Sequence, residues 1–163
     1  MPEPKLCILD AGPIIHLDEI GVLHLLGALG HVVVTETVVA EAARHRPGRD
    51  VCSQFEVVED VENIPRRVAV TASRHSLDSG ELAALAWGEI FGADVFVSDD
   101  SKARLAAKEL GFKITGTLGV ILHALRKGII TKPAAIALLE RIPAESTLHI
   151  SVDFLSETVA RLR

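Results

Sequence analysis

Two adjacent carboxylates, Asp99 and Asp100, stand between two regular patterns. The apolar residues 95–97 predict a buried strand, and residues 101–110 predict a helix that ends at Gly111. Asp is among the best residues at a helix N-terminus, because its carboxylate accepts hydrogen bonds from the free N–H groups of the first turn. A helix needs one such cap, so the second carboxylate is available for another role. Carboxylate oxygens are the usual ligands of hard divalent cations.

Three more acidic residues occupy comparable places: Asp10, Glu41 and Glu81. Asp10 directly follows a predicted strand, and Glu41 lies beside the apolar stripe of a predicted helix. Glu81 stands three residues after Asp78, which is the spacing of a capping box with Asp in place of Ser or Thr. Each residue has a structural explanation when it is taken alone, so only their joint position points to chemistry.

The elements that would position these acids alternate along the chain. Strands are predicted over 5–9, 31–34, 55–59, 95–97 and 112–115, and helices over 14–26, 36–45, 81–90, 101–110, 116–128, 133–141 and 151–162. Residues 60–77 give no clear pattern. Apolar strands that alternate with helices predict an α/β fold, with a central parallel sheet of four to five strands flanked by helices on both faces. We expect one domain over 1–163, with a core over 5–130 and a helical tail over 131–163.

This fold would bring the acids together. Ligands of such sheets bind beyond the C-terminal ends of the strands, so Asp10 should meet Asp99 and Asp100 there if their strands are central and parallel. Two unit charges about 4 Å apart repel by roughly 4 kcal/mol at an effective dielectric constant near 20. Either some carboxyls are protonated, or a divalent cation neutralises them. Donors that are all oxygens favour Mg²⁺ or Mn²⁺.

Composition excludes several other kinds of site. Aromatic residues make up only 4% of the 163 residues and Tyr is absent, which argues against base-stacking platforms. Cys7 and Cys52 are far apart and have no metal-ligand spacing; without a signal peptide, they suggest a reducing cytoplasm. The longest run free of Asp, Glu, Lys and Arg, residues 20–35, is shorter than the about 20 apolar residues of a membrane span. No membrane association is expected.

The net charge of the chain is −5. Because nucleic acid is itself negative, it would have to bind at local groups of basic residues. Arg44, Lys102 and Arg104 lie on predicted helices that leave the acidic edge of the sheet. They are candidates for gripping phosphates, although solvated basic residues are common at helix ends.

Four sequence motifs carry these acids in order. Asp10 lies in the first motif, "ILDAGPIIHL", and Glu41 is the last acidic residue of the second, "VTETVVAEA". Glu81 lies in the third, "LDSGELAALAWG", and Asp100 lies in the fourth, "VFVSDDSKARLAAKELG". Together they resemble the PIN-domain family of metal-dependent nucleases, in particular a little-characterised prokaryotic branch of predicted nucleic-acid-binding proteins related to toxin–antitoxin ribonucleases. The resemblance covers residues 5 to about 130. Ser98 stands where the family's fourth motif has Thr, which is a departure from the family's pattern.

The resemblance implies hydrolysis of phosphodiester bonds, usually in RNA. Asp10, Glu81 and one or both of Asp99 and Asp100 would hold one or two Mg²⁺ or Mn²⁺ ions. Glu41 would bind a second metal or orient water, which makes the expected catalytic residues Asp10, Glu41, Glu81 and Asp100. A bound metal lowers the pKa of its water and polarises the phosphate.

The resemblance also implies partners for the protein. They are an RNA substrate, a small antitoxin protein and a second copy of the chain in a homodimer.

Other classes of protein were weighed against the same residues. A haloacid-dehalogenase-type phosphotransferase would need an Asp where this chain has Gly12, and a P-loop NTPase would need a Gly-x-x-x-x-Gly-Lys run that the chain lacks. For a response-regulator receiver, "FEVVED" and "FKIT" offer only weak candidates. A non-catalytic PIN-fold module that binds nucleic acid or protein stays open as an alternative.

Overall fold

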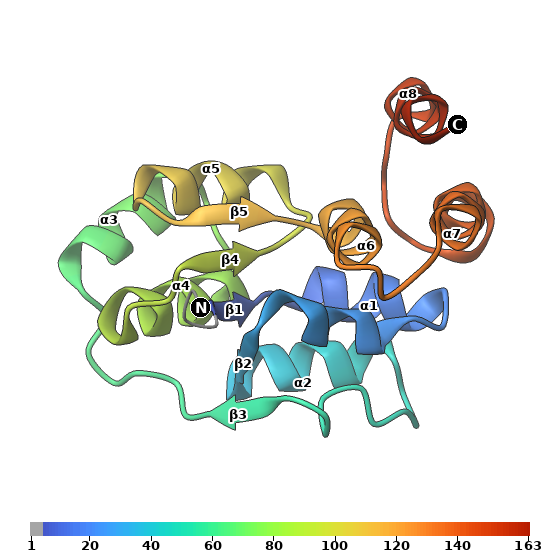
Figure 1. Cartoon of the computed structure of the whole chain (residues 1–163). Coiled ribbons are helices and arrows are strands. Elements are labelled where there is room, and N and C mark those ends of the chain that lie inside the picture. Colours follow the sequence, from blue (N-terminus) through green and yellow to red (C-terminus); the bar gives the residue numbers. More distant parts are fainter. Residues whose placement is uncertain (1–4) are drawn as a thin grey trace.

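A computed structural model describes residues 5–163. Its sheet has five strands: β1 (Leu6–Leu9), β2 (His31–Thr35), β3 (Glu56–Val58), β4 (Val95–Val97) and β5 (Lys113–Thr115). Their order is β3-β2-β1-β4-β5 and every neighbouring pair is parallel. In Figure 1 the strands follow one another from β5 at the top to β3 at the bottom. The predicted parallel sheet is therefore confirmed.

Helices connect the strands. They are α1 (Ala11–Glu19), the 3₁₀ helix η1 (Leu23–Leu29), α2 (Glu36–His45), α3 (Arg66–Arg74), α4 (Ser79–Phe91), α5 (Ser101–Glu109), α6 (Thr117–Arg126), α7 (Lys132–Glu145) and α8 (Val152–Leu162). Helix α4 packs on β1 and β2, and α5 packs on β5, while η1 packs on β2 and α6. The predicted three-layer α/β/α arrangement is confirmed.

The central pair of strands positions the acidic edge. β1 and β4 are side by side with Leu9 opposite Val97, and both strands are buried apart from Leu6, which is only partly buried. The backbone N–H of Asp10 donates to the carbonyl of Val97 at 2.9 Å, which continues the parallel ladder by one residue. Asp10 and Ser98 therefore leave the sheet side by side.

The structure differs from the expected elements in two helices and adds one in the segment without a clear pattern. The helix predicted over 14–26 is wrong as one piece: α1 ends at Glu19, and Gly21, with φ of +75°, turns the chain into η1. That φ is costly for residues with a Cβ, so glycine permits the break. Within 60–77, α3 forms over Arg66–Arg74. Helix α7 continues to Glu145 and contains Pro143 instead of ending at 141.

The C-terminal part returns to the acidic edge. Helices α7 and α8 pack on each other and lie beyond α6 (Figure 1). Between them, the segment 146–150, here called the strap, is fixed to α1 by Glu19. The Glu19 carboxylate accepts from Ser146 Oγ at 2.8 Å and from the backbone N–H of Thr147 at 2.7 Å. Across residues 5–163, we find no helix with the length and apolar character that crossing a membrane requires.

Candidate active site

A cleft of about 510 Å³ opens beyond the C-terminal ends of β1 and β4. Six carboxylates line it: Asp10, Glu41, Asp78, Glu81, Asp99 and Asp100. The strap closes another wall with Thr147, Leu148 and His149. The five acids predicted from the sequence thus lie around one cleft, and Asp78 joins them.

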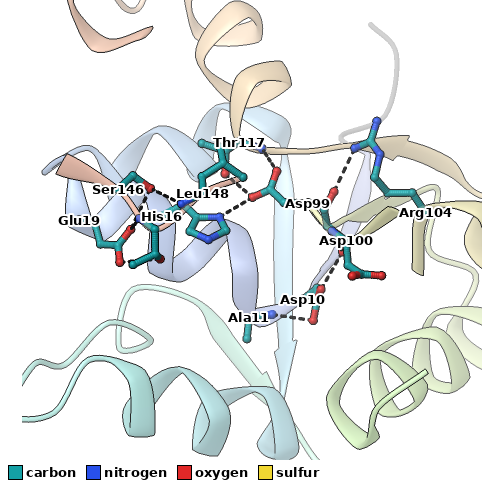
Figure 2. Close-up of polar contacts among 12 residues, drawn as sticks. Asp10, Ala11, His16, Glu19, Asp99, Asp100, Arg104, Thr117, Ser146 and Leu148 are labelled. Carbon is teal, nitrogen blue, oxygen red and sulfur yellow. Dashed lines mark hydrogen bonds and ion pairs between the residues drawn. The ribbon is translucent and has the colours of Figure 1, made fainter. Parts of the chain in front are cut away.

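Asp10 is the most buried of the six carboxylates that line the cleft. It is 5% exposed; one carboxylate oxygen accepts from the N–H of Ala11 at 2.8 Å, and the other accepts from Ser98 Oγ at 2.7 Å (Figure 2). Burial raises the pKa of Asp10 to about 7, and the charge of Glu41 adds to the effect, although both hydrogen bonds oppose it. The hydroxyl of Ser98 thus has a definite role here, which is to orient the Asp10 carboxylate.

Glu81 completes the capping box at the start of α4 and faces the same cleft. The expected capping box is present: Asp78 Oδ1 accepts from the N–H of Glu81 at 2.8 Å, and Glu81 Oε2 accepts from the N–H of Asp78 at 3.0 Å. This arrangement leaves Glu81 Oε1 without a capping role. Burial, together with the charges of Asp10, Asp78 and Asp100, raises the pKa of Glu81 to about 7, although the hydrogen bond from the N–H of Asp78 opposes the shift. Glu81 can therefore complete the capping box through Oε2 and still face the cleft with Oε1.

Glu41 reaches the first turn of α4 from α2. A Cβ at Gly80 would lie 2.5 Å from Glu41 Oε2, so the carboxylate occupies the space that the missing side chain leaves. Burial raises the pKa of Glu41, and the Asp78 charge raises it again. Glu41 is thus a half-buried carboxylate beside other carboxylates, unlike an ordinary solvated Glu on a helix.

Asp99 and Asp100 point in different directions (Figure 2). Asp100 is exposed and caps α5, with Oδ1 accepting from the N–H of Ala103 at 2.9 Å. The Asp99 carboxylate accepts a hydrogen bond from His16 Nδ1 at 2.7 Å. It also accepts two from Thr117, one from the backbone N–H at 2.7 Å and one from the hydroxyl at 2.6 Å. Burial works to raise the pKa of Asp99, but these hydrogen bonds outweigh it and hold the pKa below its usual value.

The three basic residues expected to bind phosphates differ in their exposure and in their contacts. Arg44 and Lys102 are exposed and do not line the cleft. Arg104 is half-buried, and its guanidinium donates to the carbonyl of Ser98 at 3.0 Å. Only Arg104 is therefore held close to the acidic edge.

Several cleft residues were not anticipated from the sequence. They are His16, His45 and the strap residues Thr147–His149. A histidine inside the apolar run "PIIHL" was the only local signal, and it marked His16 as a polar group in a buried helix. The strap gave no signal, because its position depends on contacts with Glu19, more than a hundred residues earlier in the chain.

The donor set suits a hard divalent cation, because it consists of carboxylate oxygens that raise one another's pKa. In the part of the chain from 5 to 163, no three His, Cys, Asp or Glu side chains are arranged as a ready-made metal site.

Comparison with known proteins agrees with this fold. A family model described as DUF3368: PIN domain matches residues 6–163, so the chain belongs to this PIN-domain family. The match includes the C-terminal tail, which the sequence motifs left uncertain. Members of the PIN-domain family are generally nucleases that use divalent metals.

Solved structures show the same fold. The crystal structure of PAE2754 from Pyrobaculum aerophilum is similar with a TM-score of 0.52 and 19% sequence identity, over 74% of this chain and 90% of that one. A search of curated proteins gives no match. The structural similarity at this identity concerns the fold, so the chemistry of the cleft has to be argued from its own residues.

Proposed function

We propose that this protein is a divalent-metal-dependent endoribonuclease whose active site is the acidic cleft. The observation that carries the proposal is the convergence of six carboxylates on one cleft, in which Asp10 and Glu81 are buried and have a pKa raised to about 7. A fold gains no stability from such a cluster. A cation that binds there would relieve the repulsion and would be placed where substrates of parallel sheets bind.

Asp10, Glu81 and Asp100 are the residues that would hold Mg²⁺ or Mn²⁺. When bound, the ion supplies a water of lowered pKa and polarises the phosphate. We prefer Asp100 to Asp99 as a ligand, because Asp99 already accepts three hydrogen bonds from His16 and Thr117. Asp100 uses one oxygen for its cap and has the other available.

The chain's own groups would perform the remaining tasks. Ser98 keeps the Asp10 carboxylate in one orientation through its hydroxyl. Glu41, held against Gly80 and with a raised pKa, is suited to accept a proton from an attacking water. Arg104, whose guanidinium donates to the carbonyl of Ser98 beside the acidic edge, is suited to bind a phosphate of the substrate strand.

Cleavage of a mixed RNA pool tests the proposal. We expect internal cleavage with Mn²⁺ or Mg²⁺ and none in EDTA. Protein that is folded by circular dichroism, and purified through a denaturation and refolding step that removes any bound inhibitor, is the sample to use. Equal cleavage in EDTA, or no cleavage of the pool with either metal, would contradict the proposal. A small antitoxin partner, a homodimer and a cytoplasmic location stay predictions from the family resemblance.

A further inference from the structure

A second cavity, of about 360 Å³, adjoins the acidic cleft. Its wall is mostly apolar and comes from β5, α6, the strap and α8, with Ile114, Leu118, Leu122, Ile150 and Phe154 among its side chains. The two cavities share Asp99, Leu148 and His149 in their walls. A strand of substrate could therefore pass from one to the other without leaving the surface.

Phe154 is the unusual residue of this cavity. It lies in the first turn of α8 and is 57% exposed, although it lines the cavity. The α8 N-terminus is capped by Ser151, whose hydroxyl accepts from the N–H of Phe154 at 3.0 Å, so the backbone that carries the ring is fixed. An aromatic face on a fixed backbone in an apolar wall is suited to stacking on one planar group.

Arg104 supplies charge complementarity at the border of the two cavities. It lines the apolar cavity and donates to the carbonyl of Ser98, and it forms no ion pair with any carboxylate in the chain from residue 5 onward. A guanidinium that has no acidic partner next to a strongly acidic cleft suits a phosphate. An apolar slot, an aromatic face and a phosphate-binding cation together match a nucleotide.

We infer that this second cavity binds one unpaired nucleobase of the substrate, next to the phosphate that lies in the acidic cleft. The inference rests on the proposed function, and what it adds is the place of this base, in the apolar cavity beside Phe154. A base within a duplex stays stacked between its neighbours and cannot enter the cavity unless it is flipped out. One ring for one base is also consistent with the low aromatic content of the chain.

Binding of RNA to Phe154→Ala tests the inference separately from cleavage. The probe is a fluorescein-labelled, single-stranded decaribonucleotide of mixed sequence, measured by anisotropy in EDTA at low salt. A hairpin of equal length, closed by a flexible glycol linker in place of loop nucleotides, is the duplex probe. Stacking on one base corresponds to about a tenfold change in Kd. We expect Phe154→Ala to weaken binding of the single strand about tenfold and binding of the hairpin less than twofold.

Phe91→Ala is the matched control. Phe91 is also 57% exposed, but it stacks on Trp87 at a centroid distance of 4.7 Å and lines neither the acidic cleft nor the apolar cavity. Its Kd should stay within about twofold of the parent protein. Phe154→Leu keeps an apolar side chain without a stacking face and should also weaken binding, while melting curves show whether each variant is folded.

Several outcomes overturn the inference. An unchanged Kd for folded Phe154→Ala, equal binding of single strand and hairpin by the parent protein, or no RNA binding at all would do so. If light scattering shows that Phe154→Ala changes a dimer to a monomer while RNA binding is unchanged, a second copy of the chain covers this cavity instead. A parent protein that binds the single strand with the expected dependence on Phe154, but cleaves nothing with Mn²⁺, would refute only the proposed nuclease activity.

Discussion

Asp99 and Asp100 are neighbours in the sequence, but their carboxylates have different surroundings. Asp99 is tied to His16 and Thr117, which connects β4 to α1 and α6. Asp100 caps α5 and stays exposed at the cleft. The sequence predicts that one of the two caps the helix, and this is what the structure shows for Asp100. It could not predict the partners of Asp99, because His16 lies 83 residues earlier in the chain.

Paired substitutions separate these two roles. Asp99→Asn replaces one acceptor with a donor that faces His16 or Thr117, so we expect a loss of about 1 to 3 kcal/mol in the free energy of unfolding and an unchanged response to Mn²⁺. Asp100→Asn keeps a good N-cap, so its stability should change by less than about 0.5 kcal/mol, while cleavage falls at least tenfold. Thermal melts and cleavage assays measure both. The opposite pattern would place Asp99, and not Asp100, at the metal.

The position of Asp10 in the fold could be predicted from the sequence alone. A carboxylate that directly follows a buried strand has to lie at the C-terminal edge of a parallel sheet, and the register of β1 with β4 confirms this position. Asp78 was judged only as a capping residue, because its distance from the other acids depends on how α4 packs on the sheet.

The first turn of α4 is the element that depends most closely on its sequence. Gly80 leaves room for the Glu41 carboxylate, and Glu81 completes the capping box on the next residue. An Ala at position 80 would be a better helix former, so the glycine has a packing reason. The glycine lets the Glu41 carboxylate lie against this turn, near Asp78.

Gly80→Ala tests this close packing. The new Cβ would displace the Glu41 carboxylate, and a displacement of about 1 Å in a catalytic group can cost up to about 100-fold in rate. We expect cleavage to fall about 10- to 100-fold while the helix stays folded. Gly27→Ala is the control, because a Cβ there meets nothing within 4 Å. Equal rates for the two variants would show that the exact position of Glu41 does not matter.

Element boundaries were predicted well where one face is clearly apolar and poorly where it is not. β4 and α2 have the predicted bounds, 95–97 and 36–45. Helix α3 was missed, because its buried side contains only Val68, Thr71 and Ala72 between basic and small residues. The break between α1 and η1 was missed because apolar residues stand on both sides of Gly21, so the pattern continues through the turn.

For the molecule as a whole, the raised pKa values link the cleft to stability. The pKa of Asp10 and of Glu81 is about 7 in the folded protein and 3.8 and 4.5 in the absence of the fold. The folded state therefore holds these protons to higher pH than the unfolded state does. Their contribution to stability is fully present below about pH 4 and is lost as the pH rises through about 7.

Melting curves of the metal-free protein between pH 5 and pH 8 test this linkage. Each carboxyl contributes a slope of up to about 1.4 kcal/mol per pH unit within that window. We expect the melting temperature in EDTA to fall with rising pH, and the fall to be smaller in Asp10→Asn, because Asn does not titrate. The difference between the two proteins removes the effect of the other titrating groups. Parallel curves for the two proteins would contradict the raised pKa of Asp10.

The central claim is that the acidic cleft is a metal-dependent catalytic centre. Its most direct test is the shift in melting temperature that Mn²⁺ causes at pH 7.5 in the parent protein and in Asp10→Asn, with NaCl of equal ionic strength as the control. A cation at a hundredfold excess over its Kd stabilises the folded state by about 2.7 kcal/mol. We predict that Asp10→Asn is at least as stable as the parent in EDTA and loses both the Mn²⁺ shift and the cleavage. A variant that is destabilised in EDTA but still stabilised by Mn²⁺ would contradict the claim.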